Sequence, residues 1–421
     1  MNEPLNSLGV IEGFYGRPWT PAQRRRLYGW MASWGMNTYL YAPKDDLWHR
    51  ARWRDPYPLR EQEVLASLAS DARSHSVRFV YALAPGLDFD WGAPRDQKAL
   101  LGKVASLTAL GVRDFALLFD DIPCRPDRAA QAKEQVQATH HVQRFLDAQG
   151  PGGPLLFCPT EYCAERAVPT VTASPYLKLL GEQLDPRIEV FWTGPQVVSP
   201  QISAESLREV ARVLRRRPLL WDNYYASDYT SRRLHLGPYG GRPLELRTEV
   251  SGILCNPNTP LEPNFPGLAS VADYAAASPG WTAEASGERA LNAWLPEFTA
   301  HQPAELAVTA EDLAFVADTL YVPHRTGPRA IRLLEAARRV ADEPRHQASR
   351  TVLLAGRRHF RRVLHALETG PNRDLLYDLH PFLADVTEEL TRLLAAAKAG
   401  RTTFPYRGGL ADGLLRLGWP E

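Results

Sequence analysis

The stretch FALLFDDI, residues 115–122, is an apolar run with strand character that ends abruptly in two adjacent carboxylates, Asp120 and Asp121. Adjacent carboxylates at the end of a buried strand cost free energy because they repel each other and lose hydration. An Asp-Asp pair also occurs where a loop begins, with one carboxylate capping a helix and the other in water. Taken alone, the pair is more typical of a loop start. Other runs of the same form earlier and later in the chain favour an acid/base site.

Eight short apolar runs recur along the first 260 residues, and stretches that suit helices separate most of them. They are Leu8–Tyr15, Thr38–Ala42, Val77–Leu83, Phe115–Phe119, Leu155–Cys158, Ile188–Trp192, Leu219–Trp221 and Gly252–Cys255. Near-continuous apolar strands that alternate with helices are typical of a parallel sheet buried on both faces. Eight such units predict an α/β fold, specifically a (β/α)8 barrel.

Beyond about residue 300 the strand signals give way to Ala-, Leu- and Arg-rich segments with helical periodicity. Thr309 and Asp312 resemble an N-terminal capping pair, and Pro381 predicts a kink or a division in a later helix. One side of that helix carries Leu375, Leu376, Leu379, Leu383, Val386 and Leu390. We therefore expect a barrel domain at 1–290, a boundary between 285 and 305, and an α-helical domain at 300–421.

The balance of charged residues bears on which classes of partner the protein binds. Lysine and arginine number 49 against 48 acidic residues, so nothing in the net charge favours nucleic acid or an anionic membrane. The N-terminus lacks a signal-peptide pattern, and no apolar run approaches the ~20 residues that span a bilayer. We expect a cytoplasmic protein that binds a small or neutral ligand. The four cysteines show no metal-binding spacing, so we expect free thiols, no metal and no cofactor.

The residues that close the apolar runs are unusually polar, and catalytic groups of a (β/α)8 barrel lie at the carboxyl ends of its strands. These closing groups are Glu12 to Gly16, Lys44-Asp45-Asp46, Asp120-Asp121, Thr160-Glu161-Tyr162, Trp192-Thr193-Gly194, Trp221-Asp222-Asn223 and Asn256-Pro257-Asn258. Aromatic faces pack against a pyranose, and amides and carboxylates bind its hydroxyls. A carboxylate pair can also perform acid/base work on a glycosidic bond. The pattern indicates a sugar site.

Eight motifs in this order resemble one family. They are GVIEGFYGRPWT, NTYLYAPKDD, FALLFDDI, FCPTEYC, WTGPQVVS, LLWDNYYASDY, LGPYGGRP and GILCNPN. Together they closely resemble the catalytic domain of glycoside hydrolase family 84, the O-GlcNAcases and bacterial hyaluronidase-like β-N-acetylglucosaminidases. The resemblance covers roughly residues 7–285 and is specific, because eight separate motifs match at compatible spacing.

This resemblance implies a retaining hydrolysis of terminal β-linked N-acetylglucosamine (GlcNAc), in which the substrate's acetamido oxygen forms an oxazoline. Asp120 would orient the acetamido N–H, and Asp121 would protonate the leaving oxygen and later deprotonate water. Adjacent residues of a regular strand face opposite ways. The backbone must therefore leave regular β geometry near Asp120.

The resemblance also implies a set of sugar-binding residues. Contacts to the sugar hydroxyls would come from Gly13, Lys44, Asn223, Asp228 and Asn256, with Tyr162 close to the acetamido group or the oxazoline. Each has a structural alternative: a turn glycine, a Lys44 pair with Asp45 or Asp46, loop capping by the asparagines, and packing by Tyr162. Trp192 and Trp221 could equally wall the pocket or pack in the core.

Two functional hypotheses follow from the sequence. The first is an active exo-β-N-acetylglucosaminidase that acts on a GlcNAc-bearing protein or glycan. The alternative is a catalytically weak or inactive GlcNAc-recognition or scaffold protein on the same barrel, which the presence of Asp121 beside Asp120 disfavours. Tyr225 and Ser227 stand where the animal family members carry His and Asn, so the pocket rim differs from theirs. The resemblance further implies a homodimer formed through the helical domain.

Overall fold

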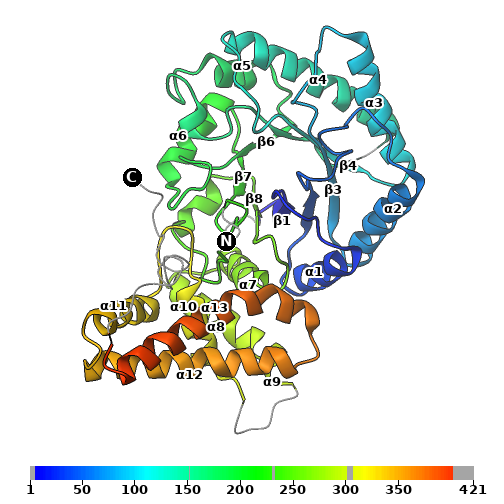
Figure 1. Cartoon of the computed structure of the whole chain (residues 1–421). Helices are drawn as coiled ribbons and strands as arrows, with labels where there is room; N and C mark the ends of the chain where they lie inside the picture. The colour runs from blue at the N-terminus through cyan, green and yellow to red at the C-terminus, as the bar shows by residue number, and fades with distance from the viewer. Residues whose placement is uncertain (1–4, 151, 230–232, 301–306, 402–421) are drawn as a thin grey trace. The chain divides into compact units, whose positions relative to one another are not determined.

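The computed structural model describes residues 5–150, 152–229, 233–300 and 307–401 (Figure 1). The chain divides into two compact units. The first comprises Met1–Ala226 with Gly240–Thr259, and the second comprises Ser227–Tyr239 with Pro260–Glu421.

The first unit is a closed barrel of eight parallel strands, each paired with the next and the last with the first (Figure 1). The strands are β1 Ser7–Glu12, β2 Thr38–Tyr41, β3 Arg78–Leu83, β4 Asp114–Leu118, β5 Leu156–Cys158, β6 Glu189–Trp192, β7 Leu219–Asp222 and β8 Gly252–Cys255. The predicted (β/α)8 barrel is confirmed, and every expected run overlaps one of these strands.

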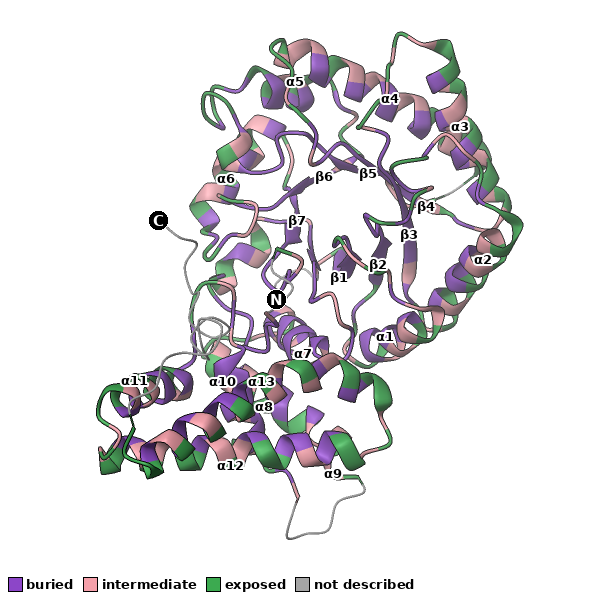
Figure 2. Cartoon of the chain, in the orientation of Figure 1, coloured by how far each residue is buried: buried purple, intermediate pink, exposed green. Residues whose placement is uncertain are grey.

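Helices surround the barrel, and their exposed residues face away from it while the strands are buried (Figure 2). They are α1 Pro21–Ser33, α2 Leu59–Ser74, α3 Pro94–Ala109, α4 Arg128–Gln149, α5 Pro175–Gln183 and α6 Ala204–Leu214, with short 3-10 helices η1 Ala164–Arg166 and η2 Leu244–Thr248. Every residue of β1, β2, β7 and β8 is buried. Burial on both faces explains why these strands are continuous apolar runs without alternation.

The second unit is helical. Its helices are α7 Asn264–Ala275, α8 Ala283–Trp294, α9 Pro296–Thr299, α10 Ala310–Thr319, α11 Pro328–Asp342, α12 Gln347–Thr369 and α13 Arg373–Lys398. The predicted capping pair is confirmed, because Thr309 and Asp312 exchange side-chain and backbone hydrogen bonds at the start of α10. The six apolar residues predicted on one side of α13 are buried, and this helix continues through Pro381 without dividing.

The division into compact units places α7 and α8 with the helical region, whereas the sequence led us to expect a boundary between 285 and 305. The assignment of 1–290 and 300–421 as separate domains therefore stays a prediction. Within the described ranges, none of the helices combines the length and the apolar character that crossing a bilayer requires.

Candidate active site

The two adjacent carboxylates lie at the carboxyl end of the barrel, separated from the end of β4 by Phe119 alone. The strand ends at Leu118, and Asp121 adopts a left-handed backbone conformation with φ of 53°. Non-glycine residues rarely have positive φ, and Asp is one of the few that tolerate it. The predicted departure from regular β geometry is confirmed. It lets both carboxylates serve one end of the barrel.

Asp120 is a buried carboxylate with one oxygen engaged and one available. Its Oδ2 forms an ion pair with the Nζ atom of Lys44, and only 8% of the Asp120 side chain is exposed. Its Oδ1 is buried without a hydrogen-bond partner among the described residues. Burial raises the pKa of Asp120, but the charge and the hydrogen bond of Lys44 outweigh burial and leave that pKa below its usual value. Asp120 is thus a carboxylate with a free acceptor oxygen.

The alternative pairing of Lys44 with Asp45 or Asp46 is wrong. Asp45 Oδ2 accepts a hydrogen bond of 2.6 Å from the backbone N–H of Gly16. Asp46 Oδ2 accepts from the hydroxyls of Tyr41 and Tyr57, each at 2.7 Å. The ion-pair partner of Lys44 is therefore Asp120.

Asp121 occupies a more open position, with 31% of its side chain exposed. The Tyr162 hydroxyl donates to Asp121 Oδ1 at 2.7 Å, and the Tyr15 hydroxyl donates to Oδ2 at 3.1 Å. Burial, together with the charge of Asp121, raises the pKa of both tyrosines, so both phenols remain protonated donors at neutral pH. Asp121 therefore has a phenol on each oxygen and access to solvent.

Two arginines flank this carboxylate. Arg50 donates to the Tyr15 hydroxyl at 2.6 Å and to the backbone carbonyl of Asp121 at 3.5 Å. Arg166 Nη2 lies 3.8 Å from Asp121 Oδ1, and its guanidinium carbon lies 4.7 Å from the centroid of the Tyr162 ring. Asp121 is thus held between two Arg-Tyr pairs, one for each oxygen.

A second cluster joins the ends of β7 and β8 to the loop that follows β6. Asn223 Oδ1 accepts from Trp221 Nε1 at 3.0 Å and from Asn256 Nδ2 at 2.9 Å, while Asn223 Nδ2 donates to the Val197 carbonyl at 2.7 Å. Asn256 Oδ1 is buried without a partner in the described part of the chain. The Trp221 ring links the two clusters, because the Lys44 Nζ atom lies 5.6 Å from its centroid.

The structure brings together seven of the eight predicted site residues. They are Gly13, Lys44, Asp120, Asp121, Tyr162, Asn223 and Asn256, and Gly13 is included because its backbone packs against the Trp221 ring. The eighth, Asp228, lies in the segment Ser227–Tyr239 that groups with the helical unit. Its contact with a sugar stays a prediction.

Residues 8–308 of the sequence match the family described as beta-N-acetylglucosaminidase. The chain belongs to this family of glycoside hydrolases. The resemblance to family 84 is thereby confirmed. Protein O-GlcNAcases of Rattus norvegicus and Mus musculus are each 45% identical to the chain over 272 residues, which is 63% of this chain. The chain spans only 29% of the length of these relatives.

A solved structure gives the same picture. A mutant of the O-GlcNAc hydrolase of Thermobaculum terrenum superposes with a TM-score of 0.80 at 26% sequence identity. The match covers 93% of this chain and 84% of that one. It therefore extends over both the barrel fold and the helical region of this family member.

Three other strand-end carboxylates of this glycosidase-family barrel have structural partners. Glu12 pairs with Arg24 at 2.7 Å, Asp222 pairs with Arg242 at 2.7 Å, and Glu161 pairs with Arg128. All three acidic side chains are at most 1% exposed. They were part of the polar set seen in the sequence, but their charges are neutralised inside the protein.

Sequence reasoning also missed Tyr15, Arg50 and Arg166 as neighbours of Asp121, although Tyr15 lies inside a quoted motif.

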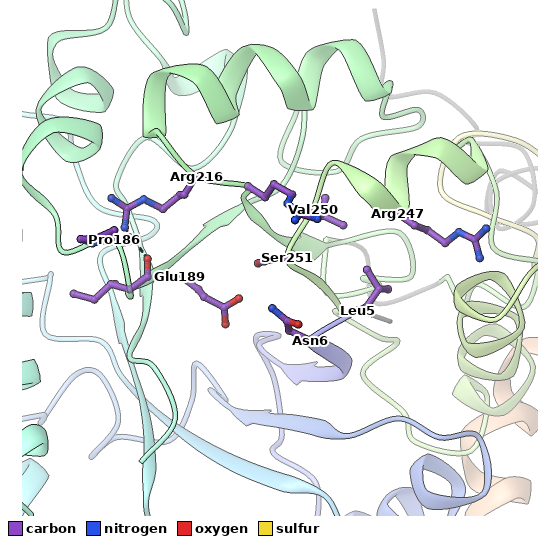
Figure 3. A pocket seen from close by; sticks show the side chains of 10 residues that line it. Leu5, Asn6, Pro186, Glu189, Arg216, Arg247, Val250 and Ser251 are labelled. Carbon is purple, nitrogen blue, oxygen red and sulfur yellow. Dashed lines mark hydrogen bonds between the residues drawn. The ribbon is translucent and has the colours of Figure 1, made fainter. Parts of the chain in front are cut away.

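A cavity of about 260 Å³ lies at the opposite end of the barrel, where the strands begin (Figure 3). Asn6, Glu189 and Ser251 line it at the points where β1, β6 and β8 begin. Arg216 borders it but donates to the backbone carbonyls of Leu184, Leu214, Asp185 and Ile188 at 2.7–3.0 Å. This arginine ties loops together at the amino end of the barrel, so its charge serves the fold.

The four cysteines are free thiols, as predicted. Within the ranges that the structure describes, no group of three or more His, Cys, Asp or Glu side chains is arranged to hold a metal ion.

Proposed function

We propose that this chain is a retaining exo-β-N-acetylglucosaminidase that hydrolyses terminal β-linked GlcNAc through an oxazoline intermediate. The observation that carries the proposal is the contrast between two adjacent carboxylates. Asp120 is buried and paired with Lys44, whereas Asp121 is partly exposed between two phenols. Family membership supports the reaction, and the name O-GlcNAcase of the relatives supports GlcNAc on serine or threonine of proteins as a substrate.

The first chemical step uses both carboxylates. Asp120 Oδ1 accepts the acetamido N–H of the substrate, which raises the electron density on the acetamido oxygen. That oxygen attacks the anomeric carbon as Asp121, in its acid form, gives its proton to the glycosidic oxygen. The bond between the anomeric carbon and this oxygen breaks, and the aglycone leaves as an alcohol. The sugar remains as an oxazoline that keeps its N–H and is therefore positively charged, and the Asp120 carboxylate that accepts this N–H offsets the charge.

The second step returns the proton. Asp121, now a carboxylate, takes a proton from a water molecule whose oxygen bonds to the anomeric carbon. The bond between that carbon and the acetamido oxygen breaks, and the acetamido group is restored. Two inversions at one carbon give net retention. The solvent access of Asp121 suits a group that must meet both the leaving oxygen and water.

The sugar hydroxyls would be bound by the second cluster. Asn256 Oδ1 is the acceptor with spare capacity, while Asn223 is fixed by three hydrogen bonds and offers its remaining N–H. Gly13 allows the chain to approach the Trp221 ring closely. Lys44, Tyr162 and Asp228 complete the proposed binding set. A homodimer through the helical region and a cytoplasmic location remain predictions, which light scattering and cell fractionation test.

The decisive experiment compares an aryl β-N-acetylglucosaminide with its N-trifluoroacetyl analogue and with an aryl β-glucoside. Cleavage that requires the acetamido group and slows sharply on fluorination is the expected result, because fluorine withdraws electrons from the attacking oxygen. Cleavage that ignores the acetamido group would contradict the mechanism. Sugar binding without cleavage of any substrate would favour the GlcNAc-recognition alternative.

Asp120→Asn and Asp121→Asn form a matched pair of variants that assigns the two roles. In kcat/KM, which reports the steps up to departure of the aglycone, loss of the acid should slow poor leaving groups by about 100-fold or more and spare activated aryl groups. Loss of Asp120 should slow all leaving groups, since attack by the acetamido oxygen accompanies the departure of each of them. The same leaving-group dependence for both variants would refute the assignment.

A further inference from the structure

We propose that Arg166 gives this site a preference for aglycones that carry a carboxylate close to the scissile oxygen. The inference rests on the proposed function and adds the substrate class. Arg166 ends the short helix η1 that follows β5, four residues after Tyr162. Its guanidinium stacks over the Tyr162 ring, 4.7 Å from the centroid, and 30% of its side chain is exposed.

Arg166 lies at the open end of the catalytic pair. The exposed fraction rises from 8% at Asp120 to 31% at Asp121, so the pair runs from the barrel interior toward solvent. The proposed acid touches the scissile oxygen. A guanidinium nitrogen 3.8 Å from its Oδ1 therefore borders the first atoms of the leaving group.

The contacts of Arg166 leave it able to bind a carboxylate. At 3.8 Å the approach to Asp121 Oδ1 is an ionic contact and too long for a hydrogen bond. The guanidinium of Arg166 lies over the Tyr162 ring and shares a side-chain hydrogen bond with Tyr162. It carries five N–H donors in a fork that matches a carboxylate, so donors remain for a ligand. A stacked and partly exposed arginine of this kind is well suited to a bidentate ligand.

The reaction itself creates a need for an anion at this position. Asp121 must be protonated to act as the acid, and in that state Arg166 loses the negative charge 3.8 Å away. The neighbouring Glu165 is exposed and accepts a hydrogen bond of 2.9 Å from Gln196 of the following loop. Arg50, on the other side of Asp121, adds a second positive charge. An aglycone carboxylate would supply the missing counter-charge in the acid form.

The test compares kcat/KM for 3-carboxyphenyl β-N-acetylglucosaminide with that for its neutral 3-carbamoylphenyl analogue. We expect wild type to prefer the carboxylate by about fivefold at low salt, and the ratio to fall as salt is added. Arg166→Gln should bring the ratio to about 1, and Arg166→Lys should retain part of it, because lysine keeps the charge without the fork. Arg187→Gln, at an exposed surface pair with Asp185, is the control and should leave the ratio unchanged.

Two outcomes would overturn the proposal: a wild-type ratio of 1, or an Arg166→Gln variant that slows both substrates equally and keeps the ratio. The second would mean that Arg166 only positions Asp121. Hydrolysis of the neutral 3-carbamoylphenyl substrate by wild type tests the proposed function independently of the carboxylate preference. If the proposed function is wrong, wild type will not hydrolyse this substrate. A glycopeptide pair with Asp or Asn beside the GlcNAc-serine extends the test to a peptide, where the Asp peptide should be preferred.

Discussion

Replacement of Gly13 by alanine tests the packing that supports the proposed sugar site. A Cβ atom at this position would lie 2.6 Å from Cζ2 of Trp221 and 2.8 Å from Cγ2 of Ile11. Carbon atoms in ordinary contact are about 3.5–4.0 Å apart, so the Trp221 ring must move by about 1 Å. Trp221 is only 4% exposed, and its Nε1 atom donates to Asn223 at 3.0 Å. The ring has little room to move while that hydrogen bond is kept.

The size of the effect follows from these contacts. Overpacking a well-packed site costs about 1–3 kcal/mol, and loss of a buried hydrogen bond adds about 1 kcal/mol. We expect Gly13→Ala to lower the free energy of unfolding by about 2–4 kcal/mol, the sum of these two terms. A displacement of about 1 Å at Asn223 should also lower kcat/KM by about 100-fold.

Thermal unfolding measures the loss of stability, and steady-state hydrolysis of an aryl β-N-acetylglucosaminide measures the loss of kcat/KM. The matched control is Gly29→Ala in α1, where an added Cβ meets no atom within 4 Å. This change should stabilise the protein by about 0.5–1 kcal/mol, because alanine is a better helix former than glycine. The reasoning would be refuted if Gly13→Ala kept the wild-type Tm and kcat/KM, or if the two alanine variants behaved alike.

Two further predictions concern charge. Burial raises the pKa of Asp378 to about 6, from 3.8, and the folded state therefore binds more protons than the unfolded state between these pH values. The stability of the wild-type protein should therefore fall as pH rises through this window. Asp378→Asn should raise the free energy of unfolding above that of wild type by at most about 3 kcal/mol at pH 7 and should not change it near pH 3. Measurements of Tm as a function of pH for both proteins test this. Lys44→Met leaves the weaker effects of Arg50 and His49 to oppose the burial of Asp120, so the pKa of that carboxyl should rise. The acid limb of the kcat/KM profile should then move to higher pH, and an unmoved limb would exclude an essential Asp120 carboxylate. The same variant should lose about 3–5 kcal/mol of stability at pH 7, measured by denaturant unfolding.

The barrel could be predicted from the sequence because its strands carry an unambiguous signal. Strands buried on both faces must be apolar throughout, and runs such as Leu219–Trp221 and Gly252–Cys255 therefore stand out between helical stretches. The start of α10 could also be predicted, because Thr309 and Asp312 have the residue types and the spacing of the capping box that they form. The predicted site residues that converge do so because they follow strands that end at one rim of the barrel.

Sequence alone could not separate the catalytic carboxylates from the structural ones. Glu12 and Asp222 end strands just as Asp120 follows one, yet each meets an arginine distant in sequence, Arg24 or Arg242. Neighbouring side chains of a strand point to opposite faces of the sheet. Which face a given carboxylate occupies depends on the strand register, and the register is known only from the folded barrel. Arg50 and Arg166 escaped notice for a related reason, because their contacts depend on loop conformation rather than on any spacing.

The backbone at Asp121 explains how one strand end can present two carboxylates to one site. Phe119 turns outward and contacts Phe89 and Phe157, while Asp120 reaches Lys44. A regular strand would send the next side chain outward again, away from the proposed sugar site. The positive φ of Asp121 reverses this direction and brings its carboxylate to Tyr15 and Tyr162.

The left-handed conformation costs about 1–2 kcal/mol for a residue with a Cβ atom. Aspartate bears this cost better than most residues, because its short polar side chain can bond locally. The two phenols and the Arg50 contact to the Asp121 carbonyl oppose the cost and hold the strained residue in place. Backbone strain of this kind persists only where surrounding contacts over-determine it, and such positions cluster at active sites. The proposed acid is thus fixed by its neighbours before any substrate arrives, so loss of Tyr15, Tyr162 or Arg50 should act on catalysis through the position of Asp121.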